Sequence, residues 1–511
     1  MIGGFLKTTS CLALLATAGV MMGGMSARAA DLGGNCCADL EERVAELEAT
    51  TARKGNRKVS LQIYGQVTET LIWFNDGKES NVFVQENNAV KNIVGFTGGA
   101  KINSDWSAGY KLELQIRSYR SSASNQVALG NNNGLTITSY NTQSVSLRHA
   151  HWYLESQTYG RLTVGRDNDA GVGTSSINLA QPDGFQAAGG FMGFSNGGYF
   201  MRRAGVAGNV GLSNATWANF AYIPNGDGPA PFDYAQTASQ VKYTSPFFLG
   251  QSKTSGFQFQ SSWGQDDMWA VALRYVEDYG IFRVAGAVSY ADQRDLDRTS
   301  CSNPGGGTAQ INALGGTAPN NGGASAAATS GVSNTSCNMW QASGSIMHVP
   351  TGLYVSGGGA QLTDNQRQKT ANIFTGNVTL SKLGTVDNND SYWWVQAGWE
   401  AKLNAMGKTT FYGTYNTFNR GFGIAGNSVQ TIAGTDVINL TGATEVMSGS
   451  QTRQWGLGVT QAIDAAAMNL YLGYINTSTD ITLQNTTTGI RARSAPVSDM
   501  DLFYTGATIK F

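Results

Sequence analysis

Charged residues are scarce in this chain of 511 residues. They make up 14% of it, whereas a typical soluble domain has about a quarter. Proline (9), cysteine (5) and histidine (3) are also few, while glycine reaches 65. Lysine and arginine (34) balance aspartate and glutamate (35), so we expect no basic surface for nucleic acid. This composition argues against an ordinary soluble enzyme.

Long apolar runs are absent beyond the N-terminal end of the sequence. The one apolar run, Ser10–Met22, follows Lys7 and precedes Ala27–Ala29, which reads as an A-x-A cleavage site. Residues 1–29 are therefore predicted to be a secretory signal peptide, with a short membrane anchor as the alternative. No later stretch approaches the roughly 18 apolar residues that a membrane-spanning helix needs. A membrane-spanning chain would have to cross with strands, and only a closed barrel satisfies strand backbones in lipid.

Residues 30–58 have a different pattern from the rest of the chain. Asp39–Ala52 is rich in charge and carries apolar residues at heptad spacing. This pattern predicts a short periplasmic helical or coiled-coil segment, although it is too short to stay helical alone. A frayed linker is the alternative.

The cysteines indicate an exported protein with a disulfide-bonded loop. Cys301 and Cys337 flank a long stretch rich in Gly, Ala, Asn and Thr, and we expect them to form a disulfide in an oxidising compartment. Cys36 and Cys37 are neighbours, and their pairing within or between chains stays open.

From Val59 onward the sequence alternates between apolar and polar residues. In Trp106–Tyr119, Tyr110 and Leu112 fall on one face, while Lys111 and Glu113 fall on the other. Similar segments recur to the C-terminus. Residues 59–511 are therefore predicted to form an all-β, transmembrane antiparallel barrel. Because bacterial barrels have even strand numbers, about 16 strands are expected, with 18 as the alternative.

Turns and loops alternate in length along this region. Long polar loops such as Arg294–Ser336 and Arg420–Ser450 alternate with short turns, as on the extracellular and periplasmic rims of a barrel. A soluble sandwich would need uniformly short strands and a propeller would need regular repeats, and the sequence has neither.

Several segments resemble outer-membrane porins. Asp39–Ser60, followed by LQIYGQV, is similar to the N-terminal signature of the alphaproteobacterial porin family. Gly95–Leu114 resembles the second hairpin of general trimeric porins, and Gly160–Arg166 resembles the strand before their third loop. The C-terminal YTGATIKF resembles the signal read by the barrel-assembly machinery, with signal residues Tyr504, Gly506, Ile509 and Phe511.

This resemblance implies a homotrimer in the outer membrane, in contact with lipid and lipopolysaccharide. Its function would be passive diffusion of small hydrophilic solutes and ions, with no enzymatic activity and no cofactor. A third loop, here Asp167–Gly198, would fold into the barrel and narrow it.

The resemblance also implies a constriction with acids on the loop and bases on the opposite wall. The candidates are Asp183 at the loop tip, Asp167 and Asp169 at its base, and the wall residues Arg148, Arg202 and Arg203. Ile93 stands at the third matching wall position, so the basic set is incomplete, which leaves charge selectivity open. Arg117, Arg274 and Arg283 lie on polar faces and could compensate, and Lys111 and Glu113 are further wall candidates.

Three alternatives remain. A substrate-specific channel could use Tyr64, Tyr471 and Trp394 as a stacking path. An envelope tether or adhesin could act through the loops and the N-terminal segment. An outer-membrane enzyme would need its few histidines at a reactive site.

The histidines also bear on a metal site. His149 and His151 share a strand face at a spacing that permits metal binding. We interpret them as polar residues of the lumen or a subunit interface, and we expect no metal. If Arg148 faces the pore, strict alternation turns both histidines away from it.

Overall fold

The structure, a computed structural model, describes the chain from residue 59 onward with gaps. The described residues are 59–86, 90–116, 126, 145–180, 199–202, 212–217, 220, 238–264, 268–294, 336–364, 389–420, 445–485, 491–495 and 497–511. The signal peptide (1–29), the segment 30–58 and Cys301 lie outside them. The predictions made for these parts stay predictions.

The described residues form strands and one short 3-10 helix, η4 (Asp464–Ala466). The strands are β1 (Gln62–Asn75), β2 (Ser80–Glu86), β3 (Ile93–Lys101), β4 (Trp106–Ile116), β5 (Val145–Ser156), β6 (Gly160–Asp167), β7 (Phe200–Arg202), β8 (Leu212–Thr216), β9 (Ala238–Thr244), β10 (Gly256–Gly264), β11 (Trp269–Asp278), β12 (Phe282–Arg294), β13 (Ser336–His348), β14 (Leu353–Asp364), β15 (Asn389–Asn404), β16 (Gly407–Arg420), β17 (Glu445–Ile463), β18 (Met468–Asn485), β19 (Arg491–Ala495) and β20 (Met500–Lys510). Within the described residues, no helix has the length and hydropathy needed to cross a bilayer.

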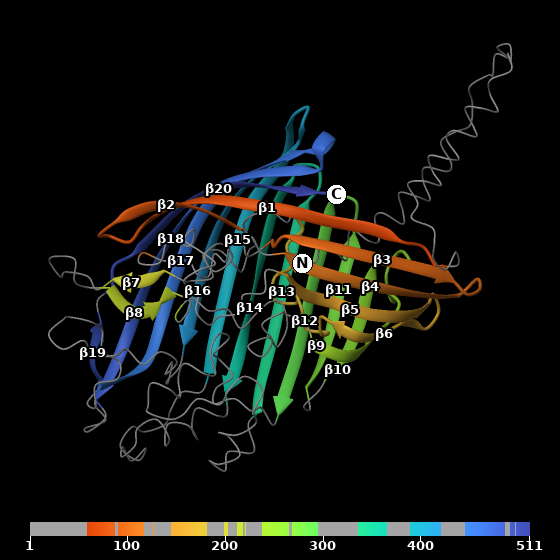
Figure 1. The fold of residues 1–511 in the computed structure, drawn as a ribbon, viewed down its shortest axis with the longest axis horizontal. Coiled ribbons are helices and arrows are strands. Elements are labelled where there is room, and N and C mark those ends of the chain that lie inside the picture. The colour runs from red at the N-terminus through yellow and green to blue at the C-terminus, as the bar shows by residue number, and fades with distance from the viewer. Residues whose placement is uncertain are drawn as a thin grey trace.

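The strands close into a barrel. All pairings in the main sheet are antiparallel, and β20 pairs with β1, so that the last strand lies beside the first (Figure 1). Both β2 and β3 pair with β1, and both β19 and β20 pair with β18. Each of these two pairs is one wall strand with a break in it, which reduces the 18 strands of the sheet to 16. The expectation of 16 strands is confirmed.

The wall has an apolar outer face and a polar inner face. In β4, Leu112 is 39% exposed and Glu113 is 2% exposed, although they are neighbours in the chain. The outer face presents large exposed apolar side chains, among them Val67, Leu71, Leu162, Val241, Leu273, Val288, Ile346, Val355, Val395, Leu457, Leu472 and Ile509. The inner face carries buried polar side chains, among them Thr70, Gln115, Gln260, Ser289, Gln341, Ser356, Gln396, Asn416, Gln454 and Thr477.

Aromatic side chains form a belt near each end of the strands. Close to the long loops, Trp269, Tyr290 and Trp340 are in contact across β11, β12 and β13. Near the short turns, contacting pairs include Trp106 with Tyr159, Phe257 with Tyr275, and Trp399 with Phe411. Paired belts around an apolar band are typical of barrels that sit in a bilayer. The chain therefore has the architecture of an outer-membrane β-barrel.

The long connection from β6 to β9 contacts the inner face in two places. Its first part, residues 168–180, hydrogen bonds with side chains of β10–β15. Its later part contains the small β7–β8 sheet, and here Tyr199, Met201, Trp217 and Phe220 join an apolar cluster on the inner face. The wall residues of that cluster include Ile72, Phe74, Ile475 and Leu502. The inner face is thus not polar throughout.

Candidate functional site on the inner wall

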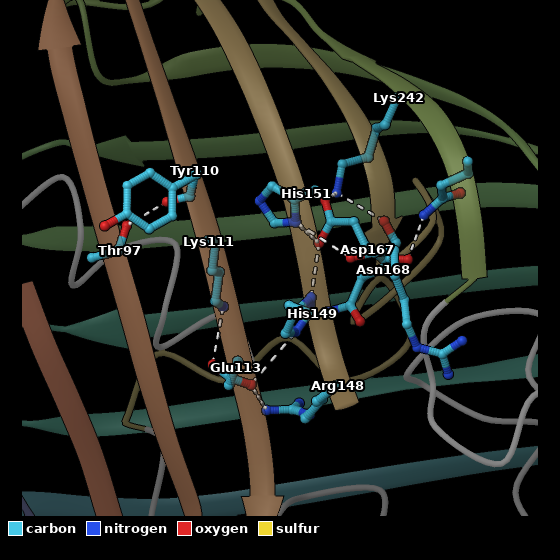
Figure 2. Close-up of polar contacts among 12 residues, drawn as sticks. Thr97, Tyr110, Lys111, Glu113, Arg148, His149, His151, Asp167, Asn168 and Lys242 are labelled. Atoms are coloured by element: carbon cyan, nitrogen blue, oxygen red, sulfur yellow. Dashed lines mark hydrogen bonds and ion pairs between the residues drawn. The ribbon is translucent and has the colours of Figure 1, made fainter. Parts of the chain in front are cut away.

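Charged side chains gather on the inner face of β4, β5, β6 and β9 (Figure 2). With Tyr64 of β1, they form what we call the inner-wall cluster. Its members are Tyr64, Lys111, Glu113, Arg148, His149, His151, Asp167 and Lys242. The cluster holds three cationic side chains and two carboxylates besides the histidines. Charge buried on a barrel wall needs such pairing, because an isolated ion is costly to remove from water.

Glu113 is the centre of one half of the cluster. Its carboxylate accepts a hydrogen bond from Arg148 Nη1 at 2.7 Å and from Tyr64 Oη at 2.6 Å. Lys111 Nζ lies 3.1 Å from Oε2, and His149 Nε2 lies 3.6 Å from Oε1. Lys111 and Glu113, both predicted for the lumen wall, are thus in one network.

A β-bulge places Arg148 and His149 on the same side of β5. In the β4–β5 register Glu113 opposes His149 and Leu114 opposes Leu147, so Arg148 is the extra residue. A bulge interrupts strict alternation and re-aims side chains. The expectation that an inward Arg148 turns the histidines away is therefore wrong, since Arg148 and His149 both approach Glu113.

Asp167 is the centre of the other half. Its Oδ1 lies 3.1 Å from His149 Nδ1 and 3.7 Å from His151 Nδ1, and its Oδ2 lies 2.5 Å from Lys242 Nζ. Lys242 also donates to the carbonyl oxygen of Asn168 at 2.8 Å. Lys242 was not among the residues predicted for the site, although the alternation of Val241, Lys242 and Tyr243 places it on a polar face.

Residues 168–180 follow the cluster directly and lie against the inner face. Arg274 Nη2 donates to the carbonyl oxygens of Val172 (2.5 Å) and Ala170 (3.2 Å). Trp394 Nε1 donates to the carbonyl oxygen of Ser175 at 2.7 Å. Asp169, predicted for the constriction, is 8% exposed and accepts the backbone N–H of Gly171 at 2.6 Å. Arg274, a candidate for the lumen wall, holds this segment to the wall.

Arg202 lies apart from Arg148, at the other end of the long connection. Its Nε donates to Asp76 at 2.6 Å and its Nη2 to Glu79 at 2.5 Å, both in the turn between β1 and β2. Burial raises the pKa of Asp76, but hydrogen bonds from the Glu79 backbone and the Arg202 guanidinium outweigh it and hold that pKa below its usual value. Arg202 thus ties the β7–β8 sheet to the rim.

The remaining predicted residues divide into two groups. Arg283 lies near a short turn, where its Nη2 is 3.1 Å from Asp278 Oδ2, away from the cluster. Arg117, Asp183 and Arg203 lie outside the described residues, so the structure neither joins them to the cluster nor separates them from it.

The residues predicted to form the C-terminal assembly signal lie in and just after β20, where the barrel closes on β1. Phe511 donates its backbone N–H to the Gly65 carbonyl at 3.0 Å, and Gly65 donates back at 2.8 Å. Tyr504 is buried on the inner face and Ile509 is exposed on the outer face. A Cβ on Gly506 would lie 2.5 Å from Tyr471 Oη, so this glycine leaves room for the tyrosine ring.

Comparison with known proteins gives structural likenesses alone. No protein-family model and no curated protein matches the sequence. The fold is similar to OmpT, an outer membrane protein of Vibrio cholerae, at 10% identity over 90% of this chain and 99% of that chain, with a TM-score of 0.47. It is also similar to an anion-selective porin from Comamonas acidovorans (13% identity, 89% and 100% covered, TM-score 0.45). The outer membrane channel DcaP of Acinetobacter baumannii gives 10% identity, 90% and 99% covered, and a TM-score of 0.43. These likenesses are distant, and they assign neither a solute nor a selectivity to this chain.

Proposed function

We propose that the chain forms a water-filled channel through the outer membrane of a Gram-negative bacterium, by which small hydrophilic solutes and ions diffuse passively. The observation that carries this proposal is a network of charged side chains on the inner wall of a closed barrel with an apolar exterior. A packed interior would favour apolar side chains, whereas a hydrated lumen favours polar and ionised ones.

The connection between β6 and β9 supports a narrowed lumen. Residues 168–180 bind the inner face of β10–β15. Farther along the connection, Tyr199, Met201, Trp217 and Phe220 pack on the inner apolar cluster at β1, β18 and β20. We infer that this connection folds into the barrel as a constriction loop. Asp183, which lies between these two parts in the sequence, stays the candidate for an acidic tip.

The charged side chains on the wall support a channel that selects among solutes and ions by its electric field. Carboxylates and cations on the wall, next to a loop that excludes bulk water, would act on ions with little screening. Dipolar solutes would be oriented by such a field, and apolar solutes would be disfavoured. Size selection would then come from the loop, and ion preference from the balance of wall charges.

A substrate-specific channel receives less support from the aromatic residues. Tyr64 donates to Glu113, Tyr471 hydrogen bonds with Thr70 at 2.6 Å, and Trp394 is 1% exposed beneath residues 168–180. These rings are held by the wall rather than presented in a row to a passing solute. Passive diffusion therefore fits better.

Planar lipid bilayers test the proposal. The purified protein should produce stepwise current increases whose conductance grows in proportion to salt concentration. We propose that it is a homotrimer, so the steps should come in threes. Liposomes carrying it should admit sugars at rates ordered by size. Absence of steps would overturn the channel, whereas saturable block by one solute would favour the substrate-specific alternative.

A tether role can be separated from conduction. Deleting residues 31–57 should leave conductance unchanged if that segment serves attachment alone. A loosened envelope in cells with this deletion would support a second, structural role.

A further inference from the structure

Three side chains of types that can bind metal ions lie close together within the inner-wall cluster. The ligand atoms of His149, His151 and Asp167 all lie within 4.8 Å of one another. The two histidines are brought together because alternate residues of a strand share a face. Asp167 joins them through the pairing of β5 with β6, in which His151 opposes Gly165. The two imidazole rings are nearly perpendicular, at 88°.

His149 Nδ1 is buried and has Asp167 Oδ1 as a close neighbour. The two atoms are 3.1 Å apart, but their alignment is poor for a hydrogen bond. Buried polar atoms in native proteins are nearly always satisfied, and an exception calls for a water, an ion or a functional role. A metal ion bound between His149 and Asp167 would satisfy the nitrogen and the carboxylate together.

The spacing of the donors suits a small transition-metal ion. Zinc binds imidazole nitrogen and carboxylate oxygen at about 2.0–2.2 Å, which separates tetrahedral donors by about 3.4 Å. Asp167 Oδ1 lies 3.1 Å from His149 Nδ1, close to that separation. It lies 3.7 Å from His151 Nδ1, which is also 3.4 Å from the Arg166 carbonyl oxygen, a contact that a metal ion at this nitrogen would replace. Imidazole donors select Zn²⁺, Cu²⁺ or Ni²⁺ over Mg²⁺ and Ca²⁺, which prefer oxygen.

The surroundings of the donors also fit a metal site. Metal-binding histidines commonly turn their second nitrogen to a carboxylate, and His149 Nε2 lies 3.6 Å from Glu113 Oε1. Lys242 contacts Asp167 through Oδ2, which leaves Oδ1 for the ion. The positive charge of Lys242 opposes a cation, so its removal should strengthen binding.

We propose that His149, His151 and Asp167 form a binding site for a divalent transition-metal ion, with Zn²⁺ as the best match. This proposal departs from the expectation of no metal, because the sequence did not show that Asp167 joins the two histidines. The site lies on the wall of the proposed channel, and a bound ion would add two positive charges there. Metal binding itself does not depend on conduction. The two properties can therefore fail separately.

Calorimetric titration of the purified protein with ZnCl₂ tests the site. One Zn²⁺ should bind per chain, and MgCl₂ should give no binding. His149→Gln and His151→Gln should each weaken zinc binding by at least roughly tenfold, and Lys242→Met should strengthen it. His348→Gln is the matched control, because His348 lies at an exposed turn with its Nδ1 2.7 Å from Thr351 Oγ1, and its loss should change nothing.

X-ray absorption at the zinc edge of the wild-type protein provides a test that needs no variant to fold. It should show nitrogen and oxygen ligands. Sulfur ligands would assign the zinc to cysteines and overturn the proposal, as would absence of binding or binding unchanged in the double variant His149→Gln/His151→Gln. In bilayers, Zn²⁺ should shift the zero-current potential toward anion selectivity. A protein that binds zinc but does not conduct would contradict the channel alone.

Discussion

Glu113 shows at the scale of one residue how the inner wall balances charge. It is 2% exposed and contacts Lys111, Arg148 and Tyr64, so its negative charge offsets two cations. Because the network lies on the inner face, a change of one charge there should be felt by permeating ions.

Glu113→Gln should therefore shift the zero-current potential in a salt gradient toward anion selectivity. It should also lower the free energy of unfolding by about 2 kcal/mol, since hydrogen bonds to a charged acceptor are replaced by neutral ones. Asp480→Asn is the matched control, because this exposed carboxylate pairs with Arg453 at 2.9 Å on the outer face. Equal shifts of potential in both variants would contradict an inner location for the conducting path.

Asp105 stabilises a short turn through its charge. The carboxylate accepts hydrogen bonds from Ser156 Oγ (2.7 Å) and from the Thr158 backbone N–H (3.2 Å), joining the β3–β4 turn to the β5–β6 turn. The bond from Ser156 holds the pKa of Asp105 below its usual value. A depressed pKa means that the stabilisation is complete above the unfolded-state pKa of about 3.9 and is lost as pH falls through the folded-state value.

Asp105→Ala should accordingly unfold at a lower temperature than the wild type at neutral pH, and the gap should shrink below about pH 4. Thermal unfolding in detergent, followed by tryptophan fluorescence, measures it. Asn103→Ala is the control, because Asn103 caps the same turn with a neutral oxygen, 2.8 Å from the Trp106 backbone nitrogen. The difference in unfolding temperature between Asn103→Ala and the wild type should not depend on pH. A difference that is equally independent of pH in Asp105→Ala would contradict this account.

Residues 168–180 are the element that links the wall to the proposed constriction. Side chains from six strands, β10 to β15, bind this one segment, and Arg274 supplies two of the bonds. A segment held at so many points should keep one position in the lumen. Loss of the bonds between this segment and the wall should therefore change the ionic current through the channel.

Arg274→Met should increase open-channel conductance and current noise, because two charge-assisted bonds worth about 1.5–3 kcal/mol each are lost. Single-channel recording measures both. Arg283→Met is the matched control, since Arg283 also lies on the inner face but pairs with Asp278 and does not hold the segment. Identical behaviour of the two variants would show that the segment does not limit the current.

The elements also show which features a sequence can predict. The period-2 pattern of β4 correctly separated Lys111 and Glu113 from Leu112, because alternation is a local property of a strand. The bulge at Arg148 was not predictable, since it depends on the register between β4 and β5. Likewise, the spacing of His149 and His151 was visible, but the approach of Asp167 depends on the β5–β6 pairing.

At the scale of the whole molecule, closure and strand number follow from pairings between distant residues. The sequence allowed 16 or 18 strands because each break, between β2 and β3 and between β19 and β20, looks like the end of a strand. Pairing of both halves with one neighbour shows that each is a single wall strand. The pairing of Arg202 with the turn between β1 and β2 could not be predicted either, because it joins residues that are far apart in the sequence.

The most direct test asks which face of the wall meets water. Lys111→Cys and Leu112→Cys, each in a background without the native cysteines, place a thiol on neighbouring residues of opposite faces. A charged, water-soluble thiol reagent added to channels in a bilayer should label Cys at position 111 and change the current. It should leave position 112 unlabelled, because lipid covers that face. Labelling of 112 with 111 protected, or labelling of 111 without any effect on current, would contradict a water-filled, conducting barrel.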